Sequence, residues 1–167
     1  RMILTRRTAL TAMCERLAAA GHRTLLPNLY WRVGRDIGFD RARFEREETG
    51  EKTRVLNLAR GVTPPMVSDD MPALLDALGP GPVAVAGYCM SGRFALLAML
   101  EHPGRVAAAA SFYGTRLVME DEASPHRRLT GLTQGEALVV FAEDDPYVPA
   151  GVPDTIAATL AQTPVPH

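Results

Sequence analysis

The apolar residues at the start of the chain recur with helical spacing. Steps of three and four residues within residues 5–20 predict an amphipathic helix, which Gly21 can end. The short apolar run 24–26, followed by Pro27 and Asn28, predicts a buried strand and a turn. The residues that carry the helical spacing are Leu10, Met13, Cys14, Leu17 and Ala18.

Residues 31–68 have a different character, because charged residues crowd them and apolar residues are sparse. This pattern predicts a surface excursion from one domain that spans residues 1–167, with short helices around residues 41–48 and 51–60. A segment of this length is typical of a cap or lid over a site. A solvated loop without a function fits the same pattern.

Beyond residue 68 helices and strands alternate. Ser68 or Asp69 can begin a helix that runs to Leu78, and the apolar run 82–87 shows no polar alternation, as expected for a strand covered on both faces. A helix over 91–102 with one buried face, strands over 106–112 and 137–142 and a helix over 154–161 follow. This order predicts an α/β fold, a mostly parallel sheet with helices on both faces.

Composition and charge narrow the function classes. Apolar residues make up 47% and charged residues 22% of the 167, the balance of an ordinary globular domain. A formal net charge of −1 provides no field for nucleic acid or an anionic membrane, and no apolar stretch approaches the roughly 20 residues that span a bilayer. Two cysteines cannot build a disulfide framework, so we expect a cytoplasmic protein. Metal and cofactor motifs are lacking, and we predict no cofactor.

The strongest chemical signal is the segment 87–92, Gly-Tyr-Cys-Met-Ser-Gly, which links a predicted strand to a predicted helix. A nucleophile at such an elbow needs small residues two positions away on either side, and Gly87 and Ser91 meet this need. The helix N-terminus favours the thiolate of Cys89, and the Met90 amide can donate to an oxyanion.

Other readings of these residues exist. Free cysteines are most often small buried hydrophobic residues, and Cys14, inside its helix, fits that description better than Cys89. Ser91 would need glycines at positions 89 and 93 to be an elbow serine, and Arg93 occupies the second of these.

Residues 87–90 and 92–93 resemble the nucleophile motif of the dienelactone hydrolase family, in which a cysteine replaces the usual serine. The resemblance extends to residues 17–21, 26–30, 105–114 and 124–126. It implies an α/β-hydrolase fold and cleavage of a small ester or lactone through an acyl group on Cys89. Ser91 departs from the family, which usually has glycine there.

A hydrolase of this type follows the chain order nucleophile, acid, histidine. The resemblance points to Asp145 as the acid, because it follows the strand 137–142 and precedes a Pro-Tyr-Val-Pro stretch. Pro146 favours an extended Asp145, compatible with a carboxylate presented from a loop. Asp144 is the main competitor, and a turn-forming role for Asp145 is the alternative.

The histidine of this order should follow one more strand, which the sequence does not contain. We therefore expect the catalytic histidine outside this chain, and a domain incomplete at both ends that lacks its first strands, its last strand and helix, and a second oxyanion donor. His22 and His102 look structural, His167 precedes the missing strand, and His126 is a replacement base only if its loop approaches the site.

Three matters stay open at this stage. Arg93 can hold a substrate carboxylate, although an arginine in a first helical turn is more often at the surface or in an ion pair. The chain can instead be an inactive relative that serves as a binding or scaffold domain. A thiol redox role for Cys89 is weaker, because no C-x-x-C motif exists. The oligomeric state and the natural substrate do not follow from the sequence.

Overall fold

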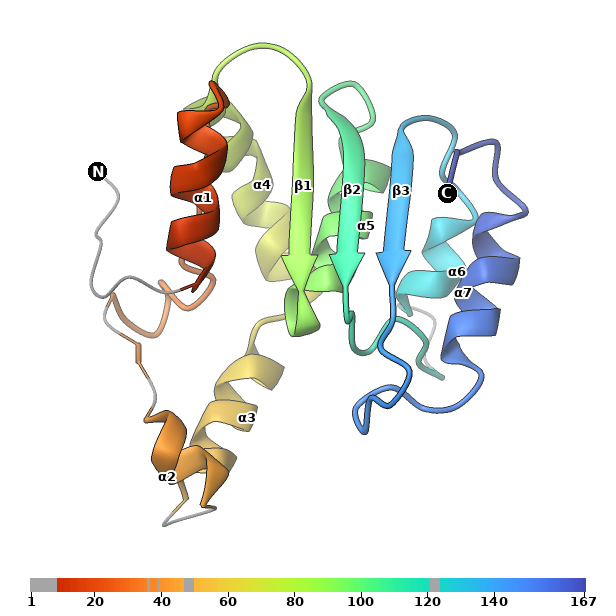
Figure 1. Ribbon diagram of the computed structural model, residues 1–167. Coiled ribbons are helices and arrows are strands. Elements are labelled where there is room, and N and C mark those ends of the chain that lie inside the picture. Colours follow the sequence, from red (N-terminus) through yellow and green to blue (C-terminus); the bar gives the residue numbers. More distant parts are fainter. Residues whose placement is uncertain (1–8, 36, 39, 47–49, 121–123) are drawn as a thin grey trace. The chain divides into compact units, whose positions relative to one another are not determined.

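The computed structural model describes residues 9–35, 37–38, 40–46, 50–120 and 124–167. The chain divides into two compact units, Arg1–Gly79 and Pro80–His167. Figure 1 labels their helices and strands. Among the described residues, none of the helices is both long and apolar enough to cross a bilayer.

The described part of the first unit is helical. The predicted short helices are confirmed, since α2 spans Arg41–Glu45 and α3 spans Glu51–Gly61, although residues 47–49 lie outside the described residues. Helix α4 spans Pro64–Leu78, so the predicted start at Ser68 or Asp69 is wrong by about one turn. Proline suits the first turn of a helix, because its missing N–H has no partner to lose there.

Helix α1 spans Ala9–Ala19, and its predicted residues 5–8 lie outside the described residues. Its apolar stripe is exposed at Leu10, Met13 and Leu17, whereas Thr11 is buried and Cys14 is half-buried. The expectation that Cys14 belongs to a core is therefore met only in part. An amphipathic face is buried only where another apolar surface covers it.

The strand predicted at residues 24–26 is wrong. This segment is half-buried, but it belongs to no strand. Extended chain becomes a strand only by pairing with a neighbour, and every strand in the described residues lies beyond Pro80.

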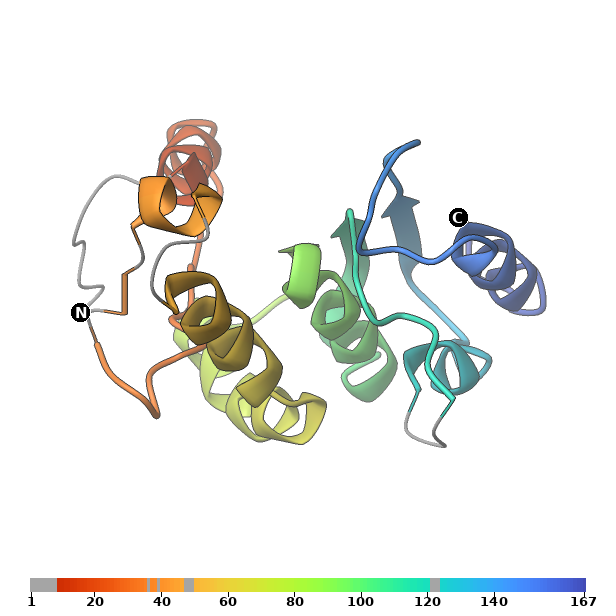
Figure 2. The same cartoon turned by 90° about the horizontal axis from the view of Figure 1, so that it is seen from below.

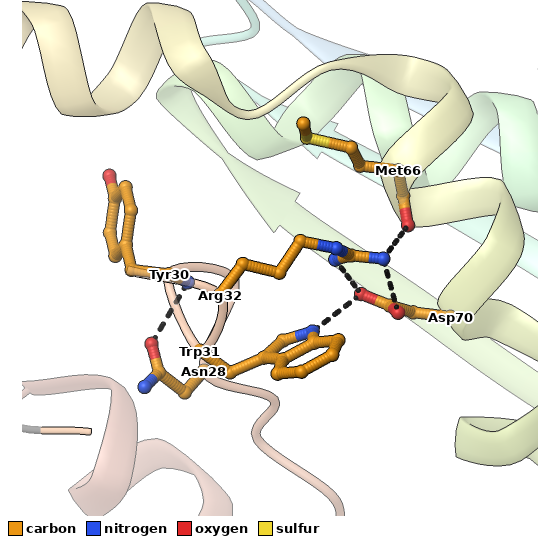
Figure 3. Close-up of polar contacts among 6 residues, drawn as sticks. All are labelled: Asn28, Tyr30, Trp31, Arg32, Met66 and Asp70. Atoms are coloured by element: carbon orange, nitrogen blue, oxygen red, sulfur yellow. Dashed lines mark hydrogen bonds and ion pairs between the residues drawn. The ribbon is translucent and has the colours of Figure 1, made fainter. Parts of the chain in front are cut away.

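A tight turn at residues 28–34 is fastened to α4 by Asp70 (Figure 3). The Arg32 guanidinium donates to both carboxylate oxygens of Asp70 at 2.8 and 2.9 Å, and Trp31 Nε1 donates to Oδ2 at 2.9 Å. The Arg32 guanidinium carbon also lies 4.5 Å from the centroid of the Trp31 ring. Both donors of the turn therefore share one carboxylate.

The second unit contains a three-stranded parallel sheet in the order β1-β2-β3. Its strands are β1 (Val83–Tyr88), β2 (Val106–Phe112) and β3 (Glu136–Val140), and its helices are α5 (Gly92–Glu101), α6 (Pro125–Leu129) and α7 (Val152–Leu160). The parallel sheet with helices confirms the predicted α/β class, and the last predicted strand is shorter than expected at its end.

Helix α5 packs against β1 and β2 and also contacts α6 (Figure 2). It is buried from Gly92 to Met99, more completely than the predicted single face. Strand β1 was predicted to be covered on both faces, but Ala84 and Ala86 are exposed. Side chains alternate between the two faces of a strand, and within this unit α5 covers one of them.

Candidate active site

Cys89 lies where β1 turns into a helix. The 3₁₀ turn η1 (Cys89–Ser91) follows Tyr88 directly and continues into α5. The backbone of Cys89 is left-handed with a φ of 52°, which is uncommon for a residue other than glycine. Cys89 is an exposed residue. This is the strained, presented geometry that the sequence predicts for an elbow.

Gly87 shows why the elbow needs a small residue. A Cβ atom at this position would lie 2.1 Å from the carbonyl oxygen of Ser91 and 2.8 Å from the nitrogen of Gly92. Both atoms belong to the backbone and cannot move aside cheaply. The turn therefore requires glycine at position 87.

Ser91 braces the same elbow. Its Oγ accepts a hydrogen bond from the Tyr88 N–H and donates one to the Tyr88 carbonyl, each at 2.8 Å. The hydroxyl is thus engaged with the backbone on the strand side of Cys89. The sequence indicates only that Ser91 is small, and this bracing role could not be predicted from that. The available signal was a serine three positions after the last strand residue, a spacing typical of helix capping.

A second close contact joins the elbow helix to β2. A Cβ atom at Gly92 or at Gly114 would lie 2.3 Å from the Oγ of Ser111. Ser111 is fully buried at 0% exposure, and its hydroxyl has no hydrogen-bond partner among the residues that the structure describes. Glycines on both sides of this hydroxyl let α5 and the loop after β2 approach the strand closely. Sequence analysis gave no indication of this contact.

Arg93 is deeply placed. Its side chain is 2% exposed, and its guanidinium carbon lies 4.7 Å from the centroid of the Phe94 ring. Burial, together with the nearby charge of Arg116, lowers the pKa of Arg93 to about 10. The arginine is therefore buried in the first turn of α5, and its contact with a substrate stays a prediction.

Asp145 lies in the loop after β3 and is half-buried, whereas its neighbour Asp144 is exposed. Oδ1 of Asp145 accepts a hydrogen bond of 2.8 Å from the Tyr147 N–H. This bond forms the turn that was the alternative role for Asp145. Among the described residues, Oδ2 has no hydrogen bond. One oxygen thus fixes the carboxylate, and the other is available to a partner.

The parallel strands bring the two predicted site residues to one edge of the sheet. In Figure 1 the strand arrows point the same way, and the segments after β1 and β3 continue beyond their tips. Strand β2 separates β1 from β3, and neighbouring strands lie about 4.8 Å apart. Cys89 and Asp145 therefore follow strands that are not direct neighbours in the sheet.

No histidine in the described part of the chain is hydrogen-bonded to Cys89 or Asp145. His126 Nδ1 lies 2.7 Å from Ser124 Oγ, which also accepts the Met119 N–H at 2.7 Å. Nδ1 of His126 is therefore engaged with the Ser124 hydroxyl. Among the described residues, histidine, cysteine and acidic side chains form no cluster that could hold a metal ion.

Comparisons with known proteins identify the family to which the chain belongs. A curated relative, the carboxymethylenebutenolidase of Rhodococcus opacus, is 31% identical over 94 residues, which are 55% of this chain. The aligned part spans 33% of the length of that relative. The sequence profile of the dienelactone hydrolase family matches residues 6–167, nearly the whole chain. The chain therefore belongs to the dienelactone hydrolase family, whose α/β-hydrolase fold agrees with its parallel sheet.

Proposed function

We propose that this protein is a hydrolase that cleaves an ester or a lactone through an acyl group carried by Cys89. The observation that carries the proposal is the left-handed backbone of Cys89, an exposed residue, at the junction of β1 and η1. A buried cysteine, or one enclosed by bulky side chains, would not present its sulfur to a substrate. Family membership supports a hydrolase. The acyl group on Cys89 is the part that we propose.

In this mechanism the Cys89 thiolate attacks the carbonyl carbon, and the carbonyl oxygen takes up the negative charge. The Met90 amide belongs to the first turn of the η1–α5 run, where backbone N–H groups and the helix dipole favour an anion. Collapse of the tetrahedral intermediate expels the alcohol and leaves a thioester. Water then attacks the thioester, which releases the acid and regenerates the thiol.

Asp145 is the proposed acid. Its free Oδ2 would accept the Nδ1–H of a histidine between Cys89 and the loop after β3, and would stabilise the imidazolium. The half-burial of Asp145 favours it over the exposed Asp144. This histidine would take the thiol proton and return one to the leaving oxygen.

A lactone with a carboxylate is the substrate class that the name of the Rhodococcus opacus relative indicates. Arg93 is the proposed partner of such a carboxylate. Since its side chain is 2% exposed, this contact requires the guanidinium to become accessible when substrate binds.

The proposal is tested by mixing the chain with p-nitrophenyl acetate and following the release of p-nitrophenolate. We expect a burst of one equivalent per chain, followed by slow turnover. Cys89→Ala should abolish the burst, while Cys14→Ala should retain it, because Cys14 lies in α1 and is half-buried. A full burst in Cys89→Ala would contradict the mechanism.

A binding or scaffold domain without catalysis is the second candidate. It is favoured by the finding that, in the described residues, no histidine is hydrogen-bonded to Cys89 or Asp145. A folded wild-type chain that binds a lactone reversibly but shows no burst with p-nitrophenyl acetate would support this candidate.

A further inference from the structure

The loop that follows β2 is fastened to the nucleophile elbow. The Thr115 N–H donates to the carbonyl of Cys89 at 3.2 Å, and the Tyr113 N–H donates to the carbonyl of Val140 at 2.8 Å. These hydrogen bonds connect the loop to the ends of both neighbouring strands. Residues 113–115 are therefore part of the same sheet edge as Cys89.

Tyr113 has an unusual backbone conformation within this loop. Its φ is 54°, close to the 52° of Cys89, and a left-handed backbone is unfavourable for a bulky aromatic residue. Gly114, the next residue, is closely packed, because a Cβ atom there would lie 2.3 Å from Ser111 Oγ and 3.1 Å from Leu117 Cδ1. The tight packing after Tyr113 thus leaves its backbone little freedom.

The strand register places Tyr113 at the same end of the sheet as the nucleophile. Tyr88 in β1 pairs with Phe112 in β2, and their rings stack with centroids 5.0 Å apart. The residues that follow this pair are Cys89, directly after β1, and Tyr113, directly after β2. Tyr113 is nevertheless 47% exposed, so much of its side chain is available to a ligand.

We propose that Tyr113 is a specificity-determining residue whose ring stacks against an aromatic or conjugated planar group next to the carbonyl that Cys89 attacks. The proposal rests on the function proposed above. An aromatic ring on a fixed backbone loses little freedom when it binds a planar group, and stacked rings attract each other beyond simple burial. Local strain at Tyr113 is then retained because it presents the ring at the site.

The test compares how fast iodoacetamide and its N-phenyl derivative alkylate Cys89 in the full chain, with peptide mapping to separate Cys89 from Cys14. For each variant, the rate with the phenyl reagent is divided by the rate with iodoacetamide. This ratio is then divided by the same ratio measured with glutathione, so that the intrinsic reactivity of the two reagents cancels. We expect wild type to favour the phenyl reagent by about 3- to 10-fold. Tyr113→Gly should remove this preference, and glycine fits the left-handed backbone. Tyr113→Phe should keep it.

Tyr147 provides the matched control, because it follows β3 at the same edge of the sheet and is 57% exposed. Tyr147→Ala should keep the preference for the phenyl reagent. An unchanged preference in Tyr113→Gly, or its loss in Tyr147→Ala alone, would overturn the proposal. If iodoacetamide itself does not modify wild-type Cys89, the nucleophile assignment is wrong, and the role of Tyr113 falls with it.

Discussion

Gly87 is the residue on which the elbow backbone depends most directly. Replacing it with alanine should lower the free energy of unfolding by about 1–3 kcal/mol or more, because the new Cβ would overlap backbone atoms of Ser91 and Gly92. Alkylation of Cys89 should slow as well, since the turn must open to admit the methyl group. Urea unfolding and iodoacetamide kinetics measure the two effects.

Gly104 serves as the control for this substitution. It lies in the turn before β2, and a Cβ atom there would meet no atom within 4 Å. Gly104→Ala should change the free energy of unfolding by no more than about 0.5 kcal/mol. Equal losses in the free energy of unfolding for Gly87→Ala and Gly104→Ala would show that the overlap at position 87 does not cause the destabilisation.

Two serines near the elbow should respond oppositely to loss of their hydroxyls. Ser91→Ala removes both hydrogen bonds to Tyr88 and should cost about 1–3 kcal/mol, because it leaves partly buried backbone groups without partners. Ser111→Ala should be neutral or slightly stabilising, since its buried hydroxyl has no partner to lose. Thermal unfolding of the two variants decides this, and a larger loss in Ser111→Ala would contradict the structure.

The elbow at Cys89 could be predicted from the sequence, because an elbow is a local feature in which a strand, a glycine, a small residue and a helix follow one another. The roles of Ser91 and Ser111 could not. A serine hydroxyl has many potential partners, and only the folded backbone determines whether it is engaged with Tyr88 or enclosed between two glycines. The deep burial of Arg93 depends on tertiary packing in the same way.

At the scale of elements, Asp70 fastens the turn at residues 28–34 to α4. Partial burial would raise the pKa of Asp70, but hydrogen bonds from Arg32 and Trp31 outweigh it and hold the pKa below its usual 3.8. The stabilisation is therefore present above the unfolded-state pKa and lost as the pH falls through the lower folded-state pKa. We expect about 1 kcal/mol for this partly exposed pair.

Trp31 is the sole tryptophan, so its fluorescence reports on this contact. In wild type the fluorescence should stay constant at neutral pH and change only below pH 3.8, as Asp70 takes up a proton. Asp70→Asn should remove this transition, whereas Asp76→Asn, at an exposed position of the same helix, should keep it. A transition that persists in Asp70→Asn would show that another group controls the environment of Trp31.

The strands that pair with one another could be predicted from the sequence. That the apolar run 24–26 forms no strand could not. β1 and β2 are rich in valine and alanine and find partners within the same unit. Residues 24–26 have the same local pattern, but pairing is a property of the neighbour as well as of the segment. The start of α4 differs from the prediction for a local reason, because proline is a favoured first-turn residue and α4 begins at Pro64.

At the scale of the whole molecule, we predict that this chain turns over esters slowly, although Cys89 reacts. Efficient acyl transfer needs a base within roughly 2.6–3.2 Å of the thiol. No histidine among the described residues is hydrogen-bonded to Cys89, and His126 is engaged with Ser124. His126→Ala should therefore leave the steady-state rate with p-nitrophenyl acetate unchanged. A large loss of turnover in that variant would make His126 the base.

The claim that Cys89 is the nucleophile is tested most directly by identifying the atom that carries the acyl group. The chain is incubated briefly with p-nitrophenyl acetate, quenched in acid, digested and analysed by mass spectrometry. We predict one acetyl group per chain on the peptide that contains Cys89, at the sulfur, and none on Cys14 or Ser91. Acetylation of Ser91 or Cys14 with Cys89 unmodified would contradict the claim that Cys89 is the nucleophile.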